Sequence, residues 1–323
     1  MKISITGASG HIGTNLCREL LRQKHELKVL VNKYTDSLQE LDLEMVQGNL
    51  LDPESLSTLA AGSEIFIHLA ACISINGNQS ILDTNYQGTV NVINRVRKSG
   101  IRRLIHFSSI HAISHDPLNE TLDETRPLAL EDHIIYNRSK ALAEKAVLEA
   151  VDGGLDAVII NPTSVMGPND FKPSLIGQAI IQLYNGKIPA LIPGGYDWVD
   201  VRDVVKGTIT AIEKGRKGES YLLSGQYVSL PDLYDMLRRL KENGKSLPVL
   251  PFWLAEVGIP FLKIWAKLTG SKPLYTRESV EILKTAHPDI SSKKAEEELG
   301  YQSRLFKETL RDTITWFREN HYI

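Results

Sequence analysis

The first residues of the chain constrain its fold the most. A short β-rich run, Ile3-Ser4-Ile5-Thr6, leads into Gly7-Ala8-Ser9-Gly10-His11-Ile12-Gly13, and a helical pattern of apolar residues follows over 11–24. Glycines at these three positions allow a tight turn, a close approach of the backbone to a phosphate and close packing of helix on strand. The helix N-terminus offers free N–H groups to the phosphates. Strand, loop and helix in this order predict a dinucleotide site; a turn rich in glycine for conformational reasons alone is the alternative.

Strand-like and helix-like segments alternate through the first half of the chain. We expect strands at 3–6, 27–31, 43–46, 64–69, 104–108 and 156–161, and helices at 11–24, 85–99 and 136–150. Strands separated by helices predict an α/β fold, a doubly wound parallel sheet that binds its ligand beyond the carboxyl ends of the strands.

The pattern changes after residue 165. Prolines interrupt it at positions 168, 173, 189 and 193, and residues 230–323 show a mostly helical pattern. We therefore expect a nucleotide-binding domain over 1–165, to which 199–229 returns with strands at 198–201 and 221–223. A smaller, mostly helical substrate lobe is expected from 166–198 and 230–323.

Composition excludes several classes of protein. The 323 residues include 37 Lys and Arg against 39 Asp and Glu, a net charge of −2, so a general nucleic-acid footprint is not expected. Two cysteines cannot form a disulfide framework. The apolar run at the N-terminus is too short for a secretion signal, and no apolar stretch is long enough to span a membrane. These features predict a cytoplasmic protein.

A tyrosine and a lysine share one face of the expected helix at 136–150. Tyr136 and Lys140 are four residues apart, so the phenol and the ammonium can lie in one site. A nearby ammonium favours the phenolate and lowers the pKa of a tyrosine. Phe107-Ser108-Ser109 ends a predicted strand at the edge where ligands bind, and a serine hydroxyl there can hold a substrate oxygen. The three residue types together predict acid/base chemistry on a hydroxyl or carbonyl group.

The spacing G-x-x-G-x-x-G, followed by Ser109, Tyr136 and Lys140, resembles the extended short-chain dehydrogenase/reductase superfamily, the NAD-dependent epimerase/dehydratase family. Residues 85–89 and 161–168 extend the resemblance, which is closest to dihydroflavonol reductases and hydroxysteroid dehydrogenase-like proteins. It implies a Rossmann domain with Tyr136 as acid/base. Lys140 would lower the tyrosine pKa and contact the nicotinamide ribose, and Ser109 would polarise the substrate, with Ser108 as the alternative.

The glycine loop and the resemblance together assign the cofactor-binding residues. They lie in the loop and at the ends of the predicted strands: Gly7, Ser9, Gly10, His11, Ile12, Gly13, Asn32, Lys33, Asn49, Leu50, Leu69, Ala70, Ala71, Asn85, Tyr136, Lys140, Pro162, Ser164 and Val165.

The end of the second predicted strand bears on the choice of cofactor. Val31 stands where the resembling sugar epimerases carry Asp, so no carboxylate repels a 2′-phosphate. Lys33 offers a cation and Asn32 an amide donor, although the resembling NADP reductases usually have Arg at the position of Asn32. We expect NADP to be preferred, with NAD usable.

Histidines give no metal-binding pattern. His106, His111, His115 and His133 are spread over a strand and long loops without ligand spacing, so we expect no metal site. His111 follows Ser109 by two residues, and it either lines the substrate pocket or is a plain loop residue.

The leading functional hypothesis is an NAD(P)-dependent oxidoreductase that reduces a carbonyl, or oxidises a secondary alcohol, of a small apolar substrate. The alternatives are a nucleotide-sugar epimerase with tightly bound NAD and, with less support, a non-catalytic nucleotide-sensing protein. A sugar 4,6-dehydratase is disfavoured. Enzymes of that kind resemble one another in a Thr/Ser-Asp-Glu triplet at the catalytic serine, whereas this chain has Ser109-Ile110-His111. Family analogy implies a homodimer through helices 85–99 and 136–150.

An apolar segment over 248–268 has no assigned role. Leu254, Val257, Phe261, Trp265 and Leu268 recur at helical spacing, and interspersed charges make the segment amphipathic. A packed helix of the lobe, a lid over an apolar substrate, and contact with a membrane surface or partner remain open.

Overall fold

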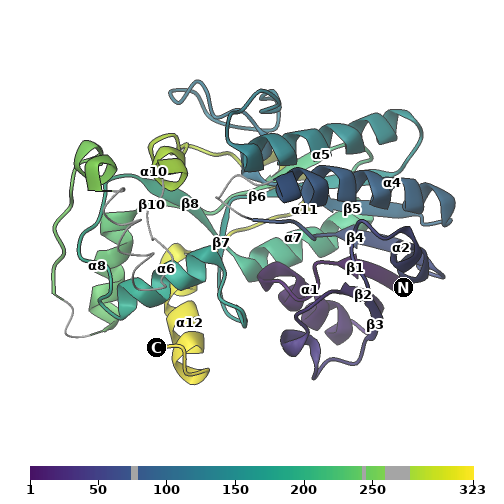
Figure 1. Ribbon diagram of the computed structural model, residues 1–323, viewed down its shortest axis with the longest axis horizontal. Coiled ribbons are helices and arrows are strands. Elements are labelled where there is room, and N and C mark those ends of the chain that lie inside the picture. The colour runs from purple at the N-terminus through teal and green to yellow at the C-terminus, as the bar shows by residue number, and fades with distance from the viewer. Residues whose placement is uncertain (74–78, 242–244, 259–276) are drawn as a thin grey trace.

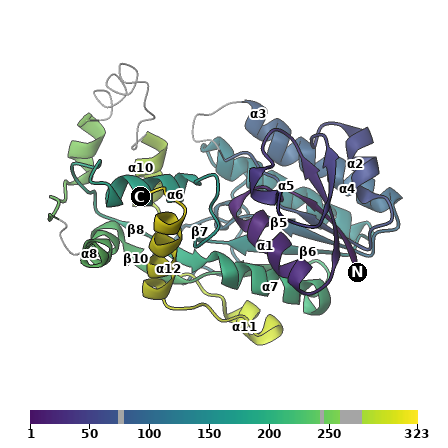
Figure 2. The same cartoon turned by 90° about the horizontal axis from the view of Figure 1, so that it is seen from below.

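A computed structural model describes residues 1–73, 79–241, 245–258 and 277–323. Figure 1 shows a layered α/β part, which carries the N-terminus, beside a second part that carries α6, α8 and the C-terminal helix α12. The turned view in Figure 2 shows helices α1 and α7 on the near face of the α/β part.

The α/β part is built on a seven-stranded parallel sheet. Its strands stand in the order β3-β2-β1-β4-β5-β6-β9. The chain moves outward from β1 to β3 and then returns to β4 on the other side of β1. The sheet therefore changes direction between β1 and β4, where the carboxyl ends of strands leave a crevice for a ligand. The strands are β1 (Lys2–Thr6), β2 (Glu26–Val31), β3 (Glu44–Gln47), β4 (Ile65–His68), β5 (Arg103–Phe107), β6 (Ala157–Pro162) and β9 (Ser220–Leu223).

Helices cover both faces of this sheet. One face packs against α1 (His11–Arg22) and α7 (Val201–Lys214), and the other against α2 (Pro53–Ala60), α4 (Gly88–Lys98) and α5 (Ile135–Asp152). Strand β4 is buried along its whole length because it is covered on both sides. The short α11 (Lys293–Leu299) packs on α7 and β9.

The structure confirms the predicted doubly wound sheet with a helical C-terminal region. The helix expected at 136–150 is α5, one residue longer at its start and two at its end. The helix expected at 85–99 is less regular: α3 (Gln79–Leu82) leads into a π-helical turn (Asp83–Gln87), and α4 begins only at Gly88. The strand expected near Trp198 is β8 (Gly195–Asp200), which pairs outside the main sheet.

A three-stranded sheet organises the second part. Strand β8 lies between β7 (Ser164–Met166) and β10 (Gln226–Ser229). Its apolar core joins the strands to the helices, with Trp198, Leu233 and Phe317 among its buried members. The helices are α6 (Leu175–Tyr184), α8 (Leu230–Leu240), α10 (Arg277–Lys284) and α12 (Phe306–Glu319), and two 3-10 turns, Asp36–Leu38 and Ile110–Ala112, lie in the α/β part.

Paired charges fasten α7 to the chain around α12. Arg304 donates to the Asp203 carboxylate, with Nη2 and Oδ1 2.7 Å apart, and its backbone N–H donates to the same carboxylate. Arg202 joins Asp200 and Asp312 at 2.7 and 2.8 Å. These contacts hold the C-terminal part against the sheet whose strand ends form the candidate site.

The apolar segment at 248–268 is described only in part. Residues 252–258 are helical, with Trp253 and Val257 exposed, and residues 259–268 lie outside the described residues. Within the described ranges, none of the helices has the length and apolar character needed to cross a membrane.

Candidate functional site

The glycine loop joins β1 to α1 at the edge of the crevice. Gly7 has a φ of +76°, and a Cβ there would lie 2.6 Å from the Ala70 backbone nitrogen. A Cβ on Gly13 would lie 2.2 Å from the Gly7 carbonyl oxygen. These two glycines are therefore required for the loop to pack on itself and on the end of β4.

Gly10 has a different environment. It is exposed, and a Cβ there would meet only the Gly7 oxygen, at 3.3 Å. Gly10 is also the N-cap of α1, where no side chain caps the helix and no acidic residue lies in the first turn. The backbone N–H groups after Gly10 are thus open to an anion. This cradle, which a side chain would fill, fits the pyrophosphate of a dinucleotide.

The predicted adenosine residues lie beyond β2 and β3. Asn32 and Lys33 are exposed, and in the described part of the chain the Lys33 ammonium makes no hydrogen bond or ion pair. The Asn49 side-chain oxygen accepts from the Leu51 N–H at 2.8 Å. Leu50 is buried in the core beneath. Lys33 is therefore a cation available to a phosphate at this end.

The segment after β4 is held by Asn85. Its Oδ1 accepts from the Cys72 N–H at 2.7 Å, and its Nδ2 donates to the Cys72 carbonyl at 3.1 Å and to Ser139 Oγ at 2.9 Å. Asn85 thereby ties this segment, which includes the partly exposed Leu69, Ala70 and Ala71, to helix α5. Asn85 stays a predicted cofactor residue, and its hydrogen bonds brace this side of the crevice, as the resemblance of residues 85–89 implies.

Pro162, Ser164 and Val165 lie at the end of β6 and in β7, on the opposite side of the crevice. Asn15 Nδ2 and His11 Nε2 donate to the Pro168 carbonyl, both at 3.0 Å. The first turn of α1 is thus fixed to the loop that follows β7.

The structure brings Ser109, Tyr136 and Lys140 together at the carboxyl end of β5. Ser109 begins the 3-10 turn after β5, and its Oγ accepts from the His111 N–H at 3.2 Å. Lys140 is buried, and its Nζ donates to the Phe107 carbonyl at 2.7 Å. The Ser109 hydroxyl is hydrogen-bonded to Tyr136.

Asp132 positions the start of α5. Its Oδ1 accepts from the Ile134 N–H at 2.7 Å, and its Oδ2 accepts from Asn137 Nδ2 at 2.9 Å. No side chain caps the helix at Ile134 itself, so Asp132 fixes the turn that delivers Tyr136.

The sequence-based prediction for the pKa of Tyr136 is wrong for the chain alone. Burial raises the pKa of the phenol, and the hydrogen bond with Ser109 opposes that rise only in part. Burial also lowers the pKa of Lys140 to about 8, against the opposing effect of Glu144. Lys140, whose ammonium bonds to the Phe107 carbonyl of β5, is not among the groups that shift the pKa of Tyr136. Tyr136 is therefore protonated at neutral pH, the state of a proton donor.

Sequence reasoning missed Glu144, and it named Asn161 only within the resembling segment 161–168 without a role of its own. Glu144 lies one helical turn beyond Lys140 and is buried, and it accepts from Asn161 Nδ2 at 2.8 Å and from Ser220 Oγ at 3.1 Å. Asn161 also donates to the Ser109 carbonyl, at 3.2 Å. Through Asn161, the Glu144 side chain thus links α5 and β6 to the 3-10 turn that begins at Ser109. The i, i+4 spacing to Lys140 was the available signal.

His111 lies in the wall of a small pocket beside Tyr136. Their ring centroids are 6.0 Å apart in an edge-on arrangement. Burial lowers the pKa of His111 to about 3, so the ring is neutral. His106 is buried in β5 and His133 is exposed, and no group of metal-ligating side chains is found in the parts of the chain described.

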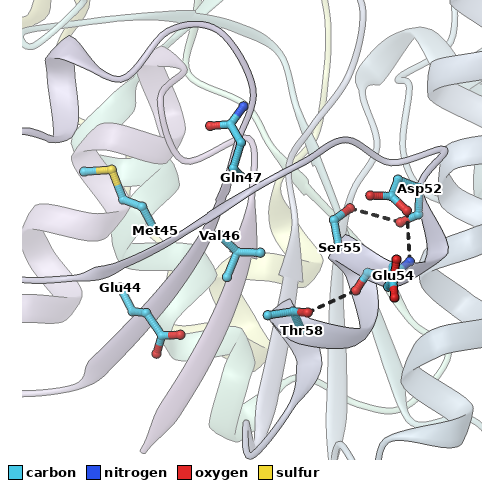
Figure 3. Close-up of a pocket in the computed structure, with 8 residues that line it drawn as sticks. All are labelled: Glu44, Met45, Val46, Gln47, Asp52, Glu54, Ser55 and Thr58. Carbon is cyan, nitrogen blue, oxygen red and sulfur yellow. Dashed lines mark hydrogen bonds between the residues drawn. The ribbon is translucent and has the colours of Figure 1, made fainter.

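A second hollow lies between β3 and α2, as Figure 3 shows. Its helix-side residues bond to one another: Ser55 Oγ donates to the Asp52 carbonyl at 3.0 Å, and Thr58 Oγ1 donates to the Glu54 carbonyl at 3.2 Å. Strand β3 stands four strands from β5, about 19 Å at the usual spacing. This hollow is therefore separate from the site at Tyr136.

Similar proteins identify the family. The model of the NAD dependent epimerase/dehydratase family matches residues 3–224. The chain is 31% identical over 330 residues to sterol demethylase protein B of Methylococcus capsulatus, with all of both chains covered. It is 30% identical to a Synechocystis protein named after dihydroflavonol 4-reductase, covering 99% of this chain and 95% of the relative.

A solved structure agrees with these relatives. The crystal structure of gox2253 is 31% identical, covers 100% of this chain and 99% of that chain, and superposes with a TM-score of 0.85. The crevice, the glycine loop and these similarities lead to one conclusion: the chain belongs to the NAD-dependent epimerase/dehydratase family of the extended short-chain dehydrogenase/reductase superfamily.

Proposed function

We propose that this chain is an oxidoreductase that reduces a carbonyl group of a small, largely apolar substrate, with Tyr136 as the proton donor. The observation that carries the proposal is the group of Ser109, Tyr136 and Lys140 at the carboxyl end of β5, beside an open glycine loop. A nicotinamide cofactor, when bound, supplies the hydride.

The chain's own residues orient the substrate and move the proton. Ser109 Oγ donates to the substrate carbonyl oxygen and holds it near the phenol. Tyr136, whose pKa is raised by burial, delivers its proton to the alkoxide oxygen as that oxygen forms. Lys140 holds a positive charge beneath the site, supported by Glu144. The same residues in reverse order serve the oxidation of a secondary alcohol.

The test begins with purified protein and a panel of aromatic and aliphatic ketones and aldehydes. The proposal expects stoichiometric loss of NADPH or NADH absorbance with at least one of them. Tightly bound NAD with no net consumption, together with interconversion of a nucleotide sugar, would instead support the epimerase. Cofactor binding without any conversion would support a nucleotide-sensing protein.

The exposed ammonium of Lys33 supports a preference for NADP. We expect Lys33→Ala to weaken NADPH binding by about tenfold, as for the loss of one hydrogen bond to a charged group, and to leave NADH binding nearly unchanged. Fluorescence titration of both cofactors measures this. The control is Lys98→Ala, an exposed lysine in the last turn of α4. Equal affinities in the wild type, or equal losses in Lys33→Ala, would contradict the preference.

The buried pair of Lys140 and Glu144 predicts a pH dependence. Because the pKa of Lys140 is lowered to about 8, the ammonium is present below that pH and is lost as pH rises through it. We expect kcat/KM for carbonyl reduction to fall above about pH 8. Glu144→Gln removes the charge that opposes the lowering, so the fall should move to lower pH.

Profiles of kcat/KM against pH report groups of the free enzyme and measure this shift. Glu149→Gln, on the exposed side of the same helix, is the matched control and should leave the profile in place. A profile of Glu144→Gln that coincides with the wild type would show that the carboxylate has no electrostatic role.

The homodimer through α4 and α5 and the cytoplasmic location remain proposals, as does the division into a nucleotide-binding domain and a substrate lobe. The helices α4 and α5 do lie side by side on one face of the sheet, as a shared two-helix surface requires (Figure 1).

A further inference from the structure

The small pocket beside Tyr136 is lined by three histidines. His111 contacts the Tyr136 ring edge-on and stacks on His115, with ring centroids 5.7 Å apart. His287, from the loop after α10, lines the same pocket although it lies 176 residues beyond His111 in the chain. The rest of the wall is mixed: it has apolar side chains from Ile110, Ile282, Ala286 and Ile290, and polar ones from Thr163, Ser164, Tyr196 and Asp197.

His287 offers a buried donor. The backbone N–H of Asp289 donates to His287 Nδ1 at 3.2 Å, so that nitrogen carries the lone pair and Nε2 carries the proton of the neutral ring. The side chain is 1% exposed, and Nε2 has no hydrogen-bond partner among the residues described. A buried N–H without an acceptor is unfavourable, and such groups normally have a partner.

His115 offers the complementary acceptor. Its Nδ1 donates to the Thr285 carbonyl at 3.0 Å, which leaves the lone pair on Nε2. This Nε2 is also buried and has no partner at hydrogen-bond distance and angle within the described ranges, although the backbone of Ile110 lies near the ring. The two histidines are close enough to influence each other electrostatically, yet no hydrogen bond joins their rings. Among its histidine nitrogens, the pocket thus presents one donor at His287 and one acceptor at His115.

We propose that this pocket binds a hydroxyl group of the substrate, whose oxygen accepts from His287 Nε2 and whose proton is donated to His115 Nε2. Water aside, a hydroxyl is the simplest group that satisfies both nitrogens; a carboxylate or a second ketone can only accept and would face the lone pair of His115. The inference rests on the proposed carbonyl reduction and narrows its substrate class to hydroxyketones. It places the second oxygen in the pocket lined by His111, the residue that contacts the Tyr136 ring.

The first arm of the test compares matched ketones. The probes are 2-octanone and its 1-hydroxy, 4-hydroxy and 5-hydroxy derivatives, with kcat/KM measured for each. The wild type should prefer at least one hydroxyketone over 2-octanone by about tenfold or more, as for one or two buried hydrogen bonds. His287→Leu and His115→Leu should each reduce that ratio to near one, and His287→Gln, which keeps a donor, should retain part of it.

His133→Leu is the control, because that side chain is 72% exposed and does not line the pocket. It should leave the ratio unchanged. Should His287→Leu fail to fold, the His115→Leu variant, at a partly exposed residue, gives the same comparison. A ratio near one in the wild type, or a ratio that both leucine variants preserve, would overturn the proposal and indicate that the pocket holds a structural water only.

The second arm does not depend on turnover. Protein labelled with ¹⁵N-histidine and saturated with oxidised cofactor is titrated with the hydroxyketones, and the Nε2 resonances of His115 and His287 are followed. Both should shift with the preferred hydroxyketone and not with 2-octanone. Shifts without turnover would support the pocket and reject the proposed reaction. Turnover of 2-octanone without shifts would support the proposed reaction and reject the hydroxyl pocket. The absence of both turnover and shifts would reject both proposals.

Discussion

Replacing Tyr136 with phenylalanine is expected to lower kcat by about 10²- to 10⁴-fold while leaving the affinity for NADPH nearly unchanged, which is the usual contribution of a positioned acid/base group. The ring of the new residue fills the same space beside His111, and only the proton donor is lost. Steady-state kinetics and cofactor titration separate the two quantities.

Tyr227→Phe, on β10 in the second part of the molecule, is the matched control and should retain full turnover. Turnover of Tyr136→Phe within about tenfold of the wild type would remove Tyr136 from the acid/base role. A loss of NADPH affinity equal to the loss of kcat would assign it to cofactor binding instead.

Gly10→Val is expected to abolish nucleotide binding while the protein remains folded. Its side chain would enter the open space above the first turn of α1, where Cβ meets only the Gly7 oxygen at 3.3 Å. Loss of two hydrogen bonds to a charged phosphate costs roughly 1.5–3 kcal/mol each. We therefore expect the Kd for NADPH to rise by about 100-fold or more, by calorimetry or fluorescence.

Gly13→Val provides the contrast. Its Cβ would lie 2.2 Å from the Gly7 oxygen and 2.7 Å from Ala8 Cα, so this variant should lose Tm and fold poorly. A Gly10→Val protein that binds NADPH as the wild type does would reject the phosphate role of the loop. A Gly10→Val protein that unfolds like Gly13→Val would assign a structural role to Gly10.

Local sequence patterns were sufficient to predict the sheet and to place Ser109, Tyr136 and Lys140, the proposed catalytic group, near one another. Strand periodicity followed by a glycine loop and a helix is a short-range signal, and β1, α1 and β2 formed where it predicted. Ser109 and Tyr136 meet because one follows a buried strand and the other begins the next helix. Parallel topology brings such positions to the same edge of the sheet.

Features that depend on burial in the folded protein could not be predicted from local sequence patterns. The pKa of Tyr136 is set by the surface that covers it, and no spacing along the helix reveals that cover. The contact of Glu144 with Asn161 requires α5 to pack on β6. His287 reaches the pocket of His111 only through the fold of the C-terminal part.

Strand β8 shows the same limit. The alternation around Trp198 predicts a strand correctly, but it does not reveal which strand is its partner. In the structure Trp198 donates from Nε1 to the Val228 carbonyl at 3.0 Å, and β8 pairs with β7 and β10 instead of joining the main sheet. The identity of a partner strand is a long-range property that the local pattern does not contain.

Transfer of deuterium from the 4-position of NADPH to a ketone carbon tests the proposed reaction most directly. Incubation of the protein with the labelled cofactor and the ketones above, followed by mass spectrometry, should show one deuterium on the carbon of the new alcohol. The transfer should fall by the same factor as kcat in Tyr136→Phe. Deuterium that stays on the nicotinamide with every carbonyl compound, while the protein binds the cofactor, would contradict the proposed oxidoreductase.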